Sequence, residues 1–139
     1  MTPSQIALIR ANFPRLADIA EPAAQLFYQR LFQTDPSTAP LFAHSDMEGQ
    51  RRKLMLAIGF IVTSLDRPDQ LLPVARSLAV RHVSYGVAAA QYESVGAALL
   101  WTLGEGLGEA FTPELHAAWG AAYRLLSGAM IEAAYPKAA

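Results

Sequence analysis

The sequence contains no cysteine, and this absence removes several kinds of site. Disulfides, thiolate metal centres, a cysteine nucleophile and covalent attachment of a cofactor through cysteine are all excluded. Charge is also sparse, since 17% of the 139 residues are charged and the formal net charge is -1. Proteins that bind nucleic acid carry a basic face, so this balance argues against nucleic acid and favours small molecules or proteins as partners.

Long apolar runs are missing as well. The longest, Leu54 to Val62, falls far short of the roughly 18 residues that a membrane span needs, and we expect it in the core. No apolar segment of the signal-peptide kind opens the sequence. We therefore expect a cytoplasmic protein without membrane insertion, folded as one domain over residues 1–139.

The sequence offers no convincing strand, because its apolar residues recur at helical spacing almost everywhere. Thr2 and Pro3 favour a helix start, and Pro14 is expected to kink or interrupt that helix. Thr112 is expected to cap the last helix. The pattern predicts an all-α fold, with a polar loop over residues 44–48 and helices over residues 2–20, 21–35, 36–42, 47–65, 70–83, 89–110 and 112–135.

One predicted helix carries a candidate metal ligand near its end. Leu78 and His82 are four residues apart and therefore share a helix face. A flat apolar ligand lying against Leu78 could receive axial coordination from the imidazole of His82, which is the geometry that a haem needs.

A second pair of residues could cover the other side of such a ligand. Gln50 and Leu54 are again four residues apart, so an amide and an apolar side chain share one face of the helix over residues 47–65. Tyr28 could add a phenolic hydroxyl from the second helix. Hydroxyl and amide donors in a dry pocket favour bound O2, which carries partial negative charge.

Each of these residues also has a simpler interpretation when it is taken alone. Tyr28 could pair with Phe27 in the core, Phe42 could fill a core position, and Gln50 could be a solvated helix residue. A histidine such as His82 at a helix end is often a satisfied residue that complements the helix dipole. Their joint spacing decides in favour of a site.

In combination, these residues resemble the single-domain bacterial haemoglobins and the globin module of flavohaemoglobins, over nearly the whole chain. The residues that carry the resemblance are Phe27-Tyr28-Gln29-Arg30-Leu31-Phe32, Leu41-Phe42, Gln50, Leu54, His82, Gly86-Val87, Gln91-Tyr92, Val95-Gly96, Leu99-Leu100, Ala118-Trp119-Gly120 and Tyr123.

The resemblance implies a globin fold around haem b and a role for each pocket residue. His82 would be the proximal iron ligand, and Tyr92 the hydroxyl on the proximal side. Phe42 would be the aromatic residue wedged against the porphyrin. Tyr28 and Gln50 would be the distal donors, and Leu54 the apolar distal lid. Leu78 and Val95 are further candidate haem contacts.

The sequence departs from this family at one position. Members commonly carry a glutamate fifteen residues after the tryptophan that matches Trp119, and here Ala134 stands there. Glu132 lies two residues earlier, which turns it by about 200 degrees around the helix to the wrong face. We therefore expect a weaker electronic push from the proximal histidine and little peroxidase-like activity.

We expect the other two histidines and most of the basic residues at the surface. His44 is expected in an exposed loop and His116 on the surface. Arg51, Arg52, Lys53 and Arg81 read as solvated charges, although Arg52 or Arg81 could pair with haem propionates.

The function that the resemblance implies is reversible O2 binding, with CO and NO as further ligands. Two distal donors would slow O2 release, which suits storage, scavenging or sensing of scarce oxygen. The alternative is nitric oxide dioxygenation, in which O2 and NO yield nitrate and a separate reductase restores the iron. A third alternative, a helical domain that has lost its cofactor and acts through protein contacts, is disfavoured by the presence of His82, Tyr28 and Gln50 together.

Overall fold

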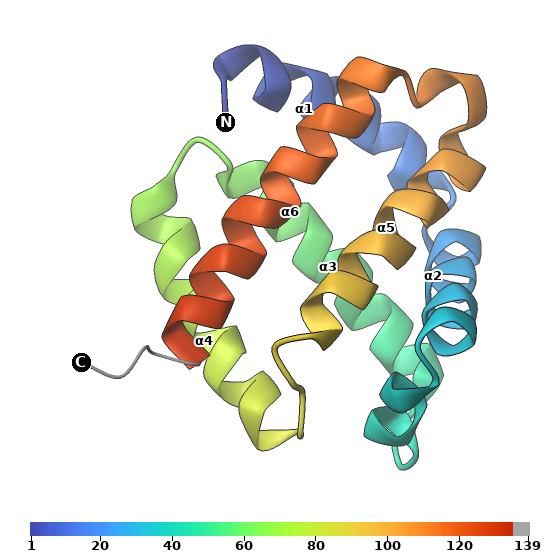
Figure 1. Cartoon of the computed structure of the whole chain (residues 1–139). Coiled ribbons are helices and arrows are strands. Elements are labelled where there is room, and N and C mark those ends of the chain that lie inside the picture. The colour runs from blue at the N-terminus through green and yellow to red at the C-terminus, as the bar shows by residue number, and fades with distance from the viewer. Residues whose placement is uncertain (135–139) are drawn as a thin grey trace.

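The computed structural model describes residues 1–134 and shows an all-helical fold over them. Six α-helices and two short 3-10 helices follow one another along this part of the chain (Figure 1). They are α1 (Pro3–Asp18), α2 (Ala20–Thr34), η1 (Pro36–Phe42), α3 (Met47–Ser64), α4 (Pro68–Ser84), α5 (Gln91–Leu107), η2 (Gly108–Ala110) and α6 (Pro113–Ala134).

Local signals explain most of the helix boundaries. The Thr2 hydroxyl accepts a hydrogen bond from the Gln5 N–H at 3.1 Å, and the Gln5 side-chain oxygen accepts one from the Thr2 N–H at 3.0 Å, which forms a capping box. The Thr112 hydroxyl likewise accepts from the Leu115 N–H at 3.2 Å, at the start of α6. Gly108 ends α5 with a φ of 56°, a conformation that glycine adopts without steric cost.

Two prolines lie inside helices of the structure. The helix α1 continues through Pro14 to Asp18, so of the two expected effects of Pro14 the interruption does not occur. Pro40 lies inside η1. Within a helix, proline removes one backbone hydrogen bond, and packing can offset that cost. Leu16, two residues after Pro14, is 2% exposed and anchors the end of α1 in the core.

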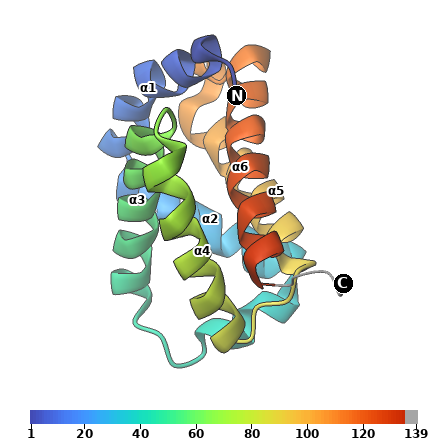
Figure 2. The same cartoon turned by 90° about the vertical axis from the view of Figure 1, so that its left-hand side faces the viewer.

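The helices α5 and α6 form one side of the molecule. Figure 1 shows them next to each other with α1 across one end, and Figure 2 shows both on the side away from α3. The helix α2 packs mainly against α5, and α4 packs mainly against α6. Figure 2 shows α4 from its outer side, flanked in that view by α3 and α6.

The largest group of buried apolar residues lies where α1, α3, α5 and α6 meet. It contains Ile9, Leu16, Leu103, Leu115 and Trp119. Two smaller groups occupy other parts of the fold, one under α2 and η1 and one between α4 and α6. Both of them use the first turns of α5, so this segment joins the two groups.

No helix among residues 1–134 has both the length and the apolar character needed to cross a membrane.

Candidate functional site

A polar pair lies in the group under α2 and η1. The side chain of Gln50, from α3, donates a hydrogen bond from Nε2 to the phenolic oxygen of Tyr28, from α2, at 3.3 Å. Tyr28 is 6% exposed and Gln50 is half-buried. The amide donates to the phenol, so within the described residues the phenolic proton remains available to a further acceptor. The structure thus brings together two of the residues that the sequence singled out.

Aromatic rings surround Tyr28 on several sides. The ring centroid of Phe27 lies 4.9 Å away and that of Phe42 lies 5.4 Å away, both in edge-to-face geometry. Phe32 adds a tilted ring at 6.0 Å and also contacts Phe42. Edge-to-face pairs of this kind stabilise a fixed ring orientation. Tyr28 is therefore both the core partner of Phe27 and the hydrogen-bond partner of Gln50, which the sequence presented as separate interpretations.

Burial also keeps the Tyr28 hydroxyl protonated. Desolvation raises the pKa of Tyr28 above its ordinary value, while the hydrogen bond from Gln50 and the charge of Arg51 act in the opposite direction. The charge of Arg51 is itself balanced by Glu21, whose carboxylate accepts from its Nε at 2.6 Å. The phenol at this position is consequently a hydrogen-bond donor at neutral pH.

His82 lies on the last turn of α4, beside Tyr92 of the buried group between α4 and α6. Its Nδ1 lies 2.6 Å from the main-chain carbonyl oxygen of Leu78, four residues earlier. A carbonyl only accepts hydrogen bonds, so Nδ1 is the protonated nitrogen of the neutral ring and Nε2 carries the free lone pair. This tautomer is the one in which Nε2 can coordinate a metal.

The environment of His82 is aromatic and apolar. The ring of Tyr92, from α5, lies roughly parallel to the His82 ring at a centroid distance of 6.4 Å, and the exposed ring of Tyr85 lies at the same distance. Tyr92 is buried together with Ala79 of α4 and Met130 of α6, with Leu78 packed against them. The structure thus groups three predicted residues, namely His82, Leu78 and Tyr92.

The predicted apolar contacts divide between the two groups of buried residues. Leu54, Val95 and Phe42 are half-buried and pack on the group that contains Tyr28. Leu78 is half-buried on the group next to His82. Half-buried apolar side chains on both groups, with hydroxyl and amide donors on one and an imidazole on the other, are the donor set and the surfaces that a haem requires.

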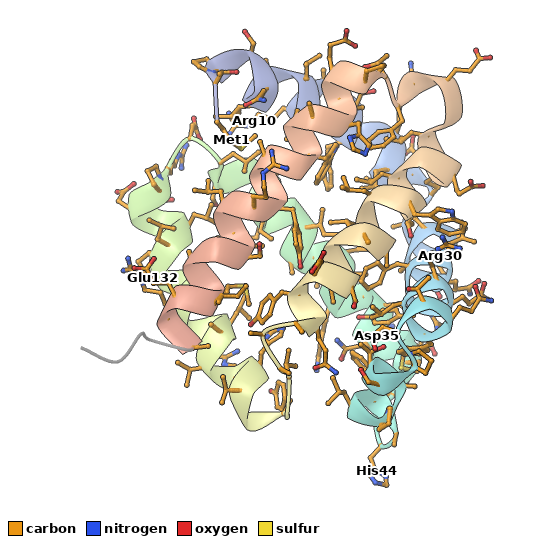
Figure 3. The ribbon with its side chains drawn as sticks, viewed as in Figure 1. Met1, Arg10, Arg30, Asp35, His44 and Glu132 are labelled. Carbon is orange, nitrogen blue, oxygen red and sulfur yellow. The ribbon has the colours of Figure 1, made fainter. Side chains whose placement is uncertain are left out.

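At the end of α6, the position where the family commonly carries a glutamate is occupied by Ala134. This residue is half-buried and packs on the apolar group next to His82. Glu132 is exposed on a different side, where it lines a surface pocket with Leu72 and Arg76 of α4 (Figure 3). The Glu132 carboxylate therefore lies away from the apolar group next to His82.

The remaining predicted residues lie at the surface. His44 is exposed at the end of the molecule and points away from it (Figure 3). His116 is exposed, and its ring centroid lies 5.5 Å from that of Phe111. Arg52 is exposed and lies 3.9 Å from the Glu48 carboxylate, which gives a weak surface pair. Among residues 1–134, no three or more His, Asp or Glu side chains form a group that could hold a bare metal ion.

Sequence analysis missed a polar cluster that ties the end of α2 to the start of α5. The Asp35 carboxylate accepts hydrogen bonds from the hydroxyls of Ser37 and Ser94, the latter at 2.6 Å. Gln91 donates from Nε2 to the Ser37 hydroxyl at 3.1 Å and accepts from the Ala88 N–H at 2.8 Å. The two bonds that connect the segments, Gln91 to Ser37 and Ser94 to Asp35, join residues 54 and 59 positions apart, so no local pattern reveals them.

Comparison with known proteins identifies the family. The sequence model of the globin family matches residues 25–130. The flavohemoprotein of Bordetella parapertussis is 38% identical over 133 residues, which cover 94% of this chain and 33% of that protein. The flavohemoprotein of Rhodopirellula baltica is 34% identical over 128 residues, which cover 91% and 31%. The chain spans about a third of the length of the curated relatives it matches.

The fold agrees with that assignment. The structure of a bacterial globin from Campylobacter jejuni superposes with a TM-score of 0.84 at 25% sequence identity, and the match covers 96% of each chain. The chain belongs to the globin family. Within this family it is homologous to the globin module of flavohemoproteins, and the matched segment contains Tyr28, Gln50 and His82.

Proposed function

We propose that this chain, as one globin domain over residues 1–139, binds haem b through Nε2 of His82 and reversibly binds O2 beside Tyr28 and Gln50. The observation that carries the proposal is the hydrogen bond from Gln50 to Tyr28, which leaves the phenolic proton available to a ligand. Membership of the globin family and the flavohemoprotein relatives support a haem. The chain has no cysteine for covalent attachment, so the b type is proposed.

A haem held by His82 supplies the iron at which O2, CO or NO binds. The protein residues on the other side hold and select the ligand. The phenol of Tyr28 donates a hydrogen bond, and Gln50 orients that phenol by donating to its oxygen. Leu54 and Phe42 are half-buried apolar residues that restrict water there, which strengthens both hydrogen bonds.

The roles proposed for the histidine side follow from its contacts. The carbonyl of Leu78 holds His82 in the tautomer that coordinates a metal, and the Leu78 side chain would contact the haem. Tyr92 stacks beside His82, and Val95, one turn later on α5, packs on the group that contains Tyr28 and would also contact the haem. Two distal hydrogen bonds slow O2 release, so we propose storage, scavenging or sensing of scarce oxygen, in the cytoplasm.

The visible absorption spectrum of the purified protein tests this proposal. His82→Ala is expected to lose specific haem coordination, because no other histidine lies in the pocket. His44→Ala and His116→Ala serve as matched controls, since both residues are exposed, and should keep the wild-type spectrum. Equal haem retention and identical spectra in all three variants would contradict the assignment of His82.

A second candidate function is nitric oxide dioxygenation, which converts O2 and NO to nitrate and needs an electron from a reductase. The observation that favours it is the homology with flavohemoproteins that are three times as long as the matched segment. We propose a separate reductase as the partner in that case. NADH-supported NO consumption, measured with and without an added flavin reductase and alongside O2 dissociation kinetics, distinguishes an enzyme from an oxygen carrier.

A further inference from the structure

Tyr123 occupies a special place between α6 and α5. Its hydroxyl donates a hydrogen bond to the main-chain carbonyl oxygen of Tyr92. The phenol of α6 therefore bonds to the backbone of the first turn of α5.

Gly96 is the residue that makes this approach possible. A Cβ atom at position 96 would lie 2.5 Å from Cε2 and 2.9 Å from Cδ2 of Tyr123, closer than carbon atoms approach in proteins. Glycine inside a helix lowers stability relative to alanine by about 0.5 to 1 kcal/mol. Its presence in α5 is thus explained by the ring that packs against it.

The phenol stays a donor over the whole working range of pH. Burial, and then the neighbouring Tyr92, raise the pKa of Tyr123 well above its ordinary value. The hydroxyl consequently keeps the hydrogen bond that it donates to the Tyr92 carbonyl.

Tyr92 connects this contact to the proposed iron ligand. Its carbonyl accepts from Tyr123, while its ring stacks at 6.4 Å on the ring of His82. Position 134, on the same helix as Tyr123, is an alanine and offers no carboxylate to His82. The helix α6 is nevertheless linked to the His82 side through the main chain of Tyr92.

We propose that Tyr123 is a positioning residue, which holds the backbone of Tyr92 and thereby sets the stacking of Tyr92 on His82. This inference rests on the proposed function for the role of His82 as iron ligand. The hydrogen bond from Tyr123 to α5 can be tested without that assumption.

The direct test is Tyr123→Phe in the haem-loaded protein. The phenylalanine ring keeps its packing against Gly96 but removes the hydrogen bond to the Tyr92 carbonyl. Amide hydrogen exchange in the first turns of α5, at residues 92–96, followed by NMR, should become about fivefold faster, the effect of losing one ordinary hydrogen bond. Exchange at the wild-type rate or slower would overturn the proposal.

A second measurement separates positioning from simple structural support. The iron–histidine stretch in resonance Raman spectra of the ferrous protein should shift in Tyr123→Phe. Tyr85→Phe is the matched control, because the Tyr85 ring is as near to His82 but exposed, and it should leave the stretch unchanged. An unshifted stretch in Tyr123→Phe, or an equal shift in both variants, would overturn the positioning role. Loss of histidine ligation in the wild type would instead contradict the proposed function.

Gly96→Ala approaches the same contact from the other side and covers the case in which Tyr123→Phe does not fold. The added methyl group displaces the Tyr123 ring, so the Raman shift should recur. Gly104→Ala places a methyl group in the same helix at an ordinary 3.6 Å from Phe111 and should leave the stretch in place. A stretch unaffected by Gly96→Ala would count against the proposal.

Discussion

The two sides of the candidate pocket are held by different kinds of hydrogen bond. On the side of Tyr28, one side chain bonds to another, with Gln50 donating across from a separate helix. On the side of His82, side chains bond to the main chain, at the carbonyls of Leu78 and Tyr92. A side-chain partner disappears with one substitution, whereas a main-chain carbonyl is present whatever the residue. Ligand affinity is thus easily changed on the first side, and the second side is the more robust framework.

The largest effect is expected on the Tyr28 side. Tyr28→Phe keeps the aromatic contacts with Phe27 and Phe42 but removes the donor, so the O2 dissociation rate should rise about ten- to a hundredfold. Gln50→Leu should raise it in the same direction. CO dissociation should respond less, because bound CO carries less charge. Stopped-flow measurement of both rates checks this, and wild-type O2 release in both variants would refute the distal hydrogen bonds.

A smaller effect is expected from restoring the carboxylate on the His82 side. Ala134→Glu should strengthen the iron–histidine bond and raise peroxidase activity, because a carboxylate near the ligand makes the imidazole more electron-rich. Resonance Raman and a peroxidase assay measure the two changes. Glu132→Gln is the control, since Glu132 lines a pocket on another side, and it should change neither. A wild-type stretch already as high as in glutamate-containing relatives, and unmoved by Ala134→Glu, would contradict this account.

The smallest effect concerns the polar cluster that joins the two sides. Hydrogen bonds from Ser37, and then from Ser94, hold the pKa of Asp35 below its ordinary value. A carboxyl with a lowered folded-state pKa stabilises the protein above its unfolded pKa of about 3.9, and that contribution is lost as the pH falls through the lower folded value.

Asp35→Asn should therefore be modestly less stable at neutral pH and should lose part of the stability change seen in acid. Urea unfolding at pH values from neutral down to about 3 measures this dependence. Asp18→Asn, at an exposed position with no such hydrogen bonds, is the matched control. Identical acid profiles for Asp35→Asn and the wild type would show that this cluster does not contribute.

Much of the fold was predictable because helices follow from local spacing. The ranges expected for the helices agree with the structure to within two residues at most of their ends, and the fold class is confirmed. The interruption considered at Pro14 does not occur, and local sequence could not decide this, because the burial of Leu16 depends on helices far along the chain. The expected end of the last helix at Tyr135 lies outside the described residues.

The candidate site likewise has features that local sequence predicts and features that only tertiary packing decides. By itself, the sequence determined which chemical groups the pocket contains, because residues four apart on a helix share a face, and this placed Gln50 with Leu54 and Leu78 with His82. Only the tertiary structure decided how those groups are held. The hydrogen bond of Tyr123 to Tyr92 joins residues 31 positions apart, and that of Ser94 to Asp35 joins residues 59 positions apart. Such contacts depend on how closely two helices approach, and that distance is set by packing over the whole core.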